Sequence, residues 1–343
     1  MSEDVLSGLL RRIRLRGALF FNVECVGAWV TEAPPAALIA SAVMPGSEHL
    51  MEYHVVLGGT CWAGITGEPP FQMNAGDVVL FPHGDPHVMS SAPGLRAAPD
   101  LPFLIANLKR HVGLPFMVRQ QDDQLVQPVT ARGETSPDLR SATLLCGFLG
   151  CDRGPFNPLL ASLPRVIHAS AGQLSVDSWA GQLARLAEAE SRASQPGGEA
   201  VLERMSEMMF VDLVRLYLCS MPKSQTGWLA ALRDRHIARV LSLMHSRPAE
   251  AWTLEKLSGA AGLSRSALQE RFVELIGQPP MQYLRCWRMQ LASNLLVDSN
   301  AKMATIAHEV GYESEEAFSR SFKRTVGQPP AMWRRERAVR QVR

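Results

Sequence analysis

Four side chains in the N-terminal third of the chain could hold a metal ion or a small ligand. Glu52 and His54 lie two residues apart, and His83 and His87 follow further along the chain. Imidazole and carboxylate groups are common ligands of zinc and iron. Only Glu52, His54 and His87 are good candidates, because His83 lies in a turn. These residues therefore favour histidines that hydrogen-bond in a metal-free pocket, with no cofactor, over a metal centre at His54 and His87.

Cysteine chemistry is a second candidate function of the same region. The six cysteines are scattered rather than arranged as a disulfide framework: Cys25, Cys61, Cys146, Cys151, Cys219 and Cys286. Oxidation of Cys25, paired with Cys61 or another thiol, would make a redox sensor. No Lys, Arg or His lies within several residues of Cys25, so the sequence offers no local cause for thiolate formation. We expect buried structural thiols and keep the redox pair as the alternative.

These residues fall in a region that reads as β-rich and is followed by helices. Short apolar runs separated by Gly, Pro and Asp turns fill residues 20–115. Apolar residues at helical spacing follow in 174–190 and 199–220. Breaks rich in Gly, Pro and Ser lie at 194–198 and 222–227. We predict an α+β chain with a β domain over 1–190, a helical connector that could form a dimer over 191–224, and an all-α domain over 225–343.

The all-α domain contains an internal repeat with a spacing of about fifty residues. Seven positions of its first copy recur in the second, with one conservative change from Tyr to Trp: Phe272, Gly277, Gln278, Pro279, Pro280, Tyr283 and Arg285 match Phe322, Gly327, Gln328, Pro329, Pro330, Trp333 and Arg335. Upstream of each copy lies the pattern of a helix-turn-helix, in which Gly262 or Gly311 makes the turn. The second turn is one residue longer than the first. Two such units on one chain imply two recognition helices that read DNA.

The repeat also predicts which side chains face the DNA. Ser264 and Ser314 would cap the two recognition helices. Phe272 and Phe322 would face inward, and the opposite sides carry groups that can contact base edges or phosphates. The candidate contacts are Arg265, Ser266, Gln269 and Glu270 in the first helix, and Glu315, Glu316, Ser319, Arg320, Lys323 and Arg324 in the second. Glu315 and Glu316 have a second interpretation, since acidic residues stabilise the N-terminal end of a helix.

The last third of the chain resembles the AraC/XylS family of bacterial transcription regulators. The resemblance covers about residues 233–337. It is carried by Ile306-Ala307, Val310-Gly311-Tyr312, Ser314, Phe318, Arg320, Phe322-Lys323, Gly327 and Pro330. It implies sequence-specific binding to double-stranded DNA through the two helices named above. Glu270 departs from the basic or amide residue that is common at its position, which leaves the base preference of the first helix open.

The N-terminal part, over roughly residues 5–190, resembles the cupin-type sensor domain of some AraC-like regulators. The segment from Gly76 to His87 follows G-x5-P-x-G-x2-H, the second cupin signature. Glu52 to Gly59 resembles the end of the first signature, but the H-x-H pair that normally precedes the glutamate is missing. The resemblance implies a β-barrel with trailing helices that senses an unidentified small molecule or redox signal.

Charge and hydropathy agree with one nucleic-acid partner and no membrane. Residues 224–343 hold 18 Lys and Arg against 11 Asp and Glu, whereas the rest of the chain holds 17 against 22. A basic C-terminal domain is expected to bind nucleic acid. No apolar run approaches the roughly 20 residues of a membrane span, and no secretory signal begins the chain, so we expect a cytoplasmic protein. A final arginine run, from Arg334 to Arg343, reads as a solvated tail.

We therefore predict a transcription regulator that is not an enzyme. Its expected partners are DNA, an effector, a second copy of the chain and, as a further candidate, RNA polymerase. The alternative function is a metal-dependent cupin enzyme that carries a DNA-binding appendage, and the incomplete first signature argues against it.

Overall fold

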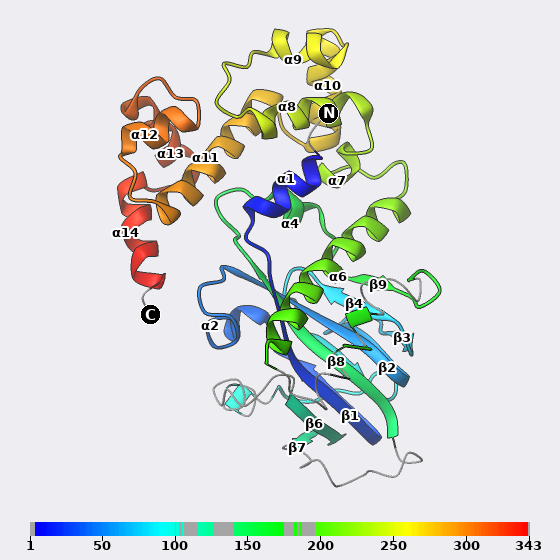
Figure 1. Cartoon of the computed structure of the whole chain (residues 1–343). Helices are drawn as coiled ribbons and strands as arrows, with labels where there is room; N and C mark the ends of the chain where they lie inside the picture. Colours follow the sequence, from blue (N-terminus) through cyan, green and yellow to red (C-terminus); the bar gives the residue numbers. More distant parts are fainter. Residues whose placement is uncertain are drawn as a thin grey trace. The chain divides into compact units, whose positions relative to one another are not determined.

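The computed structural model describes residues 4–99, 101–102, 105, 116–126, 140–174, 182–183, 185–186, 189 and 196–341. Its backbone forms two compact units, neither of which is a continuous stretch of chain (Figure 1). The barrel unit comprises residues 15–151 and 164–220. The helical unit comprises residues 1–14, 152–163 and 221–343. The helix predicted at 174–190 lies mostly outside the described residues.

The barrel unit is a nine-stranded sheet. Its strands are β1 Arg16–Ala33, β2 His49–Ile65, β3 Phe71–Asn74, β4 Val78–Phe81, β5 His87–Ser90, β6 Phe116–Asp122, β7 Gln124–Val126, β8 Arg140–Cys151 and β9 Ile167–Ala169. Three helical segments accompany them: η1 Ala36–Leu38, α2 Ala40–Val43 and α6 Gly198–Ser220. Within the described part of this unit, all strand pairs are antiparallel except β1 with β6.

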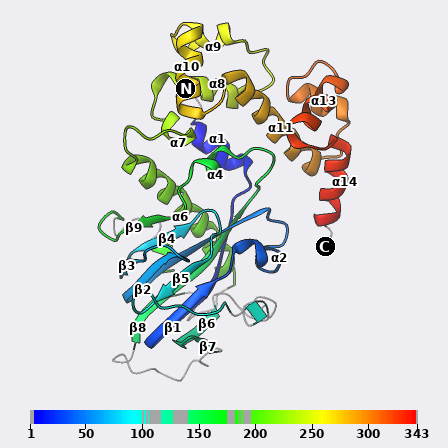
Figure 2. The same cartoon turned by 180° about the vertical axis from the view of Figure 1, so that it is seen from behind.

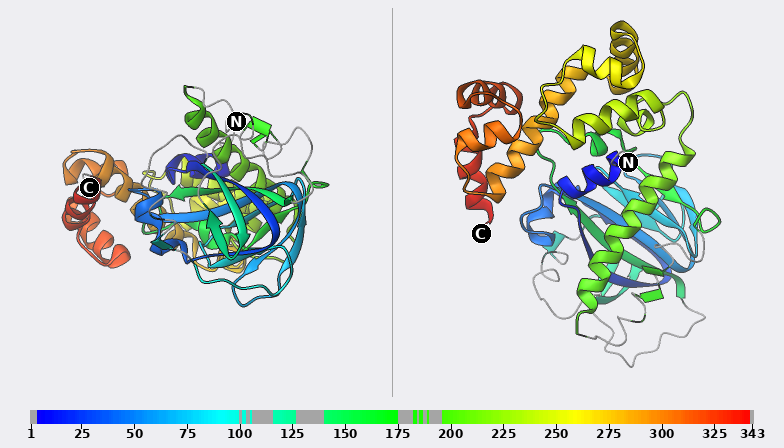
Figure 3. Two further views of the ribbon diagram at one scale, coloured as in Figure 1. Left: turned by 90° about the horizontal axis from the view of Figure 1, so that it is seen from below. Right: turned by 45° about the horizontal axis from the view of Figure 1, so that its top comes forward.

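Two long strands close the sheet into a ring. The first parts of β1 and β2 both pair with β8, and their last parts both pair with β5. A strand that pairs with one neighbour along its first part and with another along its last part bends round the interior. The strands β1, β8, β2 and β5 therefore enclose a common core. The strands curl round this interior when the unit is viewed from below (Figure 3). The predicted β-barrel is therefore present, and its core is lined by apolar side chains such as Trp29 and Phe81.

Helix α6 packs on the outside of the barrel, against β1 (Figure 2). The Tyr53 hydroxyl on β2 lies 2.8 Å from Ser206 Oγ on α6. Gly17 and Gly147 permit this packing, since a Cβ at Gly17 would collide with the backbone of Glu203 and one at Gly147 with the Tyr53 hydroxyl. Residues 199–220 are helical as predicted. Their buried side includes Met205 and Met209, whereas Met208 is exposed.

The helical unit is built round the long helix α11, which joins two helix-turn-helix pairs (Figure 1). Its helices are α1 Val5–Arg12, α4 Pro158–Ser162, α7 Trp228–Ala231, α8 Arg235–Ser246, α9 Leu254–Ala261, α10 Arg265–Ile276, α11 Pro280–Asp298, α12 Met303–Glu309, α13 Glu315–Val326 and α14 Pro330–Gln341. The first pair is α9 with α10 and the second is α12 with α13. Tyr283, Leu284 and Trp287 anchor α11 in the apolar core.

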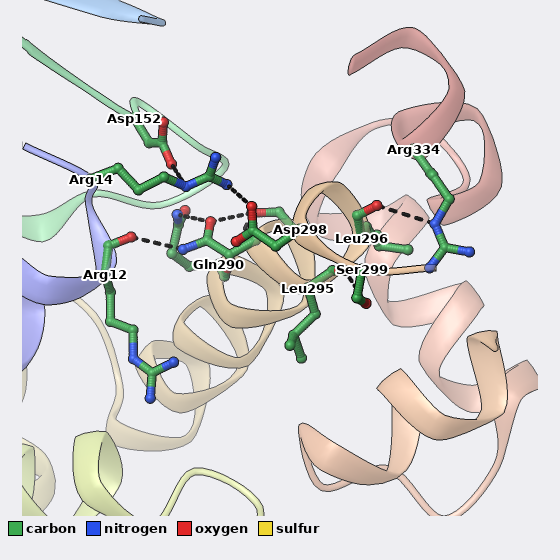
Figure 4. A network of polar contacts seen from close by, with 11 residues as sticks. Arg12, Arg14, Asp152, Gln290, Leu295, Leu296, Asp298, Ser299 and Arg334 are labelled. Carbon is green, nitrogen blue, oxygen red and sulfur yellow. Dashed lines mark hydrogen bonds and ion pairs between the residues drawn. The ribbon is translucent and has the colours of Figure 1, made fainter. Parts of the chain in front are cut away.

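Segments from far apart in the sequence complete the helical unit. Helix α1 packs against α8. The Asp152 backbone N–H donates to Ile13 O at 2.8 Å, and the Arg14 guanidinium lies 2.9 Å from Asp152 and 3.2 Å from Asp298 (Figure 4). The continuous domains expected from the sequence, 1–190, 191–224 and 225–343, thus differ from the observed units. Residues 1–14 and 152–163 fold with the C-terminal helices, and most of the expected connector is α6, which folds with the barrel.

The C-terminal arginine run also differs from its prediction. Residues 330–341 form helix α14 rather than a solvated tail. Arg334 donates to Leu296 O at 3.1 Å and to Ala301 O at 2.7 Å, so it satisfies carbonyls near the end of α11 (Figure 4). Arg337 stacks on the Trp333 ring. The repeat carried a signal for this helix, since Pro330, Trp333 and Arg335 match Pro280, Tyr283 and Arg285 at the start of α11. None of the helices described has the length and apolar character needed to cross a bilayer.

Candidate functional sites: recognition helices and barrel cavity

The two helix-turn-helix units share their local geometry. Gly262 and Gly311 follow the first helix of each pair in the left-handed region, at φ values of +68° and +83°, which a residue with a Cβ adopts at a cost. In each unit the backbone N–H after the glycine reaches back five residues, from Leu263 to Ser258 O and from Tyr312 to Ala307 O. The extra residue of the second turn lies between its glycine and the next helix, as the repeat predicts.

Serine side chains begin both recognition helices. The Ser264 and Ser314 hydroxyls accept from the backbone N–H three residues on, each at 3.2 Å. Gly277 and Gly327 end α10 and α13 at positive φ. The two copies of the repeat thus begin and end alike, and they present the same face of a helix. That face is opposite to the buried Leu268 and Phe272 in α10, and to Phe318 and Phe322 in α13.

The structure brings the predicted DNA contacts onto these exposed faces. Gln269 and Ser319 are half-buried at equivalent positions of α10 and α13. The other predicted residues are exposed: Arg265, Ser266, Glu270, Glu315, Glu316, Arg320, Lys323 and Arg324. Acidic residues occupy the first turn of α13, and Lys323 and Arg324 occupy its last turn. This order complements the helix dipole, so Glu315 and Glu316 are stabilising residues whether or not they meet a base.

One arginine of α11 links the two helix-turn-helix units of the helical unit. Arg288 donates from Nε to Pro248 O at 2.8 Å and from Nη2 to Glu250 O at 2.9 Å, both in the loop before α9. Its Nη1 donates to Gly311 O in the second turn at 3.2 Å. A planar guanidinium holds three carbonyls at once in a way that no ammonium can. Arg288 therefore fixes the relation between α9–α10 and α12–α13, and sequence reasoning missed it because its partners are backbone atoms.

The interior of the barrel contains a cavity of about 110 Å³. Its wall is mainly apolar and includes Phe21, Trp29, Met89, Leu144 and Phe148. Three of the four residues predicted for the sensor pocket line it, namely Glu52, His54 and His87. The fourth, His83, is exposed in the turn after β4. The sequence placed His83 with the others only through its motif, and the turn carries it away from the interior.

A chain of hydrogen bonds crosses the polar side of the cavity. His87 Nδ1 lies 3.0 Å from Asp85 O, which can only accept, so Nδ1 carries the proton and Nε2 is the acceptor. His54 Nε2 lies 2.7 Å from His87 Nε2 and donates to it. His54 Nδ1 then accepts from the Cys146 thiol at 2.9 Å. The side chains in this series of hydrogen bonds are all uncharged, and each of their hydrogen-bonding atoms has a partner.

Burial keeps these groups neutral. It lowers the pKa of His54 well below its ordinary value, with a further contribution from His87, and it lowers the pKa of His87 to about 4. Burial also raises the pKa of Glu52 to about 8, so this carboxyl is protonated at neutral pH. Glu52 Oε1 is buried with no hydrogen-bond partner among the described residues. Glu52, His54 and His87 are therefore uncharged, although the acidic residues Glu32 and Asp123 also line the cavity. The Trp29 indole N–H, like Glu52 Oε1, is buried without a hydrogen-bond partner among the described residues.

The thiols near the cavity are poorly suited to oxidation. Cys25 and Cys61 are buried, with exposures of 0% and 1%. Burial raises the pKa of Cys25 well above its ordinary value and that of Cys61 to about 12. The thiolate is the reactive form, and these sites suppress it. Cys146, which the sequence singled out only as one of six scattered cysteines, lines the cavity. The pairing of β8 with β2 brings it opposite His54.

The cupin fold raises the question of a metal ion. Glu52, His54 and His87 each offer a ligand atom, and these atoms lie within 4.8 Å of one another. Two imidazoles and a carboxylate form a donor set that suits zinc or non-haem iron. These residues therefore fit a metal, which would replace the hydrogen bond between His54 and His87 and use the unpartnered Glu52 oxygen.

Two protein-family models match the chain. One describes a cupin and matches residues 4–219, and the other describes a helix-turn-helix domain and matches residues 257–336. A putative AraC-like transcription regulator from Streptomyces antibioticus is 30% identical over 334 residues, which is 97% of this chain and 98% of that protein. The HTH-type transcriptional regulator AlkR from Acinetobacter baylyi is 28% identical over 337 residues, 97% of this chain and 99% of its own.

Among solved structures, the DNA-binding domain of AdpA in complex with a target DNA is similar to this chain. The match has 28% identity and a TM-score of 0.31, and it covers 32% of this chain and 98% of that domain.

Proposed function

Because the chain belongs to the AraC-like transcription regulators that carry an N-terminal cupin domain, we propose that α10 and α13 read its operator under the control of a small molecule in the barrel. The observation that supports the DNA contacts is the repeated helix, with the same serine cap, the same glycine end and an exposed polar face. Base edges are contacted from the N-terminal half of each helix, by Gln269 and Arg320 among others. Lys323 and Arg324 contact phosphates.

Selection from a pool of random DNA sequences by the full-length protein tests these assignments. Arg320→Ala should relax the preference at one position of the selected site and cost about 1–3 kcal/mol of binding free energy there. Arg324→Ala should weaken binding to all sequences and lower the salt slope by about one. Arg204→Ala, an exposed arginine on α6, is the matched control and should change neither. Selected sites that are the same for wild type and Arg320→Ala would refute the base-reading role.

The effector that fits the barrel cavity is small and uncharged. A cavity of about 110 Å³ approaches the size at which an apolar protein cavity, roughly 150 Å³, binds benzene. An anionic ligand would meet no positive charge at this wall, since both histidines are neutral. Of the other acidic residues that line it, Glu32 is already paired with Arg96 and Asp123 is exposed. A single hydroxyl or carbonyl on the ligand would bond to the free Glu52 oxygen or interrupt the chain from Cys146 to His87.

Matched pairs of compounds test this proposal. Phenol and 1-butanol should raise the melting temperature of the full-length protein, and butyrate should not. Leu144→Phe, which reduces the cavity, should abolish the effect. A shift with butyrate as large as that with butanol would refute an uncharged site.

Redox sensing is the alternative, and it predicts that Cys25→Ser or Cys61→Ser loses its response to oxidants in a promoter assay. Because both thiols are buried and protonated, we expect each variant to give the same promoter activity as wild type, with and without oxidant.

A homodimer is the assembly we propose. Val201 and Met208 are seven residues apart on α6 and are 49% and 38% exposed, which is an apolar pair two turns apart on one helix face. Val201→Glu combined with Met208→Glu should convert a dimer to a monomer in light scattering after size-exclusion chromatography. RNA polymerase remains a further proposed partner on the promoter.

A metal-dependent enzyme is the second candidate function, supported by the convergence of Glu52, His54 and His87. These three residues would hold the ion, which would act as a Lewis acid when bound. Metal analysis of the purified protein, with His54→Ala as the control, distinguishes the two. A stoichiometric ion that is lost in the variant would support the enzyme. A wild-type protein that contains no metal and still binds phenol would support the sensor.

A further inference from the structure

A second cavity lies in the helical unit, where the sequence indicated only DNA binding. It has a volume of about 290 Å³, just below the roughly 300–1,000 Å³ typical of small-molecule sites. Three helices enclose it, since its wall comes from α1 and the residue that precedes it, from α8, and from Trp287 of α11. The wall is mainly polar: Asp4, Arg11, Arg12, Ser242, His245 and Ser246 line it beside Val5, Gly8 and Trp287.

Two buried nitrogen atoms at this wall have no hydrogen-bond partner among the described residues. One is the indole N–H of Trp287 and the other is Nδ1 of His245. The rings of these two residues stack at a centroid distance of 4.0 Å, so their polar atoms belong to one small region. A buried donor that is left without an acceptor costs about 1–3 kcal/mol, and such groups are uncommon in folded proteins. Two such groups beside one cavity indicate that a ligand with a hydrogen-bond acceptor binds there.

The hydrogen bonds of His245 show that its Nδ1 is a donor. The Trp228 indole N–H donates to the Tyr283 hydroxyl at 2.7 Å. The Tyr283 proton is then used best toward His245 Nε2, which lies 2.8 Å away. Burial, aided by the nearby Arg12, lowers the pKa of His245 to about 3, so the ring is neutral and has one proton. With Nε2 accepting, that proton is on Nδ1.

The charges at the cavity have the sign that these donors require. Arg11 and Arg12 line it from the last turn of α1. The Arg12 side chain extends away from the Arg14–Asp298 network, which binds only its backbone carbonyl through Asn294 (Figure 4). The single acidic residue, Asp4, uses its carboxylate as the N-cap of α1, where it accepts from Leu6 N and Ser7 Oγ. The other charged groups of the wall are the guanidinium groups of Arg11 and Arg12. The Ser246 hydroxyl already donates to Ser242 O.

We propose that this cavity binds a small anion, with a carboxylate or phosphate group that accepts from Trp287, His245 and Arg12. The organic part of the ligand would lie against Val5 and Gly8 of α1. The ligand bridges α1 to α8 and α11, so its binding would hold α1 in place on the helical unit. The site uses no residue of the barrel cavity, and it is independent of the effector proposed above.

Calorimetric titration of the full-length protein tests the proposal. The probes are benzoate, succinate and inorganic phosphate, with benzamide as the neutral counterpart of benzoate. We expect saturable binding of at least one anion at millimolar concentration and none of benzamide. Trp287→Phe keeps the ring and removes the N–H, and Arg12→Gln removes the charge. Each should weaken the binding about tenfold or more.

Two further results separate the outcomes. Arg239→Gln, an exposed arginine on α8 outside the cavity, and Leu144→Phe in the barrel should leave anion binding unchanged. Binding of phosphate alone assigns a phosphate ligand, and binding of benzoate or succinate assigns a carboxylate. No saturable binding of any of the three anions, equal binding of benzamide, or binding that Trp287→Phe and Arg12→Gln leave unchanged would overturn the proposal.

Discussion

Arg288→Met is the substitution whose effect follows most directly from the structure. It keeps the aliphatic stem and removes the guanidinium that binds three carbonyls of the two helix-turn-helix units. Hydrogen bonds from charged donors contribute about 1.5–3 kcal/mol each, and bonds that share one donor group are not additive. Arg288 is half-buried, so water can replace part of what is lost. We expect a local cost of roughly 2–4 kcal/mol.

Hydrogen exchange of the full-length protein measures this cost where it arises. The loop that contains Pro248 and Glu250 and the turn at Gly311 should open more often, by about 30-fold or more for 2 kcal/mol. Arg288→Lys, which keeps the charge and loses the planar fork, should fall between wild type and Arg288→Met. Arg239→Met on the exposed side of α8 is the control. Wild-type protection at both segments in Arg288→Met would refute the role of Arg288.

Three other substitutions have calculable effects. Gly311→Ala places a Cβ 2.7 Å from Ala249 O at φ +83°, so it should destabilise the second unit by about 1–3 kcal/mol in urea unfolding, whereas the open Gly262 should tolerate alanine better. Ser314→Ala should cost about 1 kcal/mol through loss of the helix cap, and Ser314→Asp should restore it; equal stability of all three would contradict the capping role. His245 has a folded pKa of about 3 and an unfolded pKa near 6.5, so below pH 6.5 protons bind the unfolded chain preferentially and stability falls. His245→Phe should therefore lose about 2 kcal/mol less than wild type between pH 7.5 and pH 5, and an identical pH dependence would contradict this assignment.

Local signals explain what the sequence could predict. Ser264, Ser314 and the four glycines that end helices act on the backbone within a few residues, so the helix boundaries of the repeat could be placed without the fold. The exposed faces of α10 and α13 followed from the same periodicity, because Phe272 and Phe322 fix which side is buried. Glu52, His54 and His87 could be grouped from the sequence because the first two lie in one cupin-like segment and His87 ends the other.

The contacts that escaped prediction join residues far apart in the chain. Cys146 meets His54 only because β8 pairs with β2, 92 residues apart in sequence. The strands β1 and β8 pair, and the residues just before β1 and just after β8 both fold into the helical unit. The contacts of Arg334 and Arg288 are with backbone carbonyls, and the cavity beside His245 is formed by the packing of helices. Neither kind of feature has a sequence motif. Such tertiary contacts need the structure.

Mapping of bound DNA across the genome of the native host tests the central claim most directly. It compares the full-length protein with a double variant, Gln269→Ala and Arg320→Ala, which alters the exposed face of both recognition helices and leaves their caps and cores intact. Discrete binding sites that disappear in the double variant are the predicted result. Sites that persist unchanged in the double variant would contradict the assignment of α10 and α13 as the helices that read DNA.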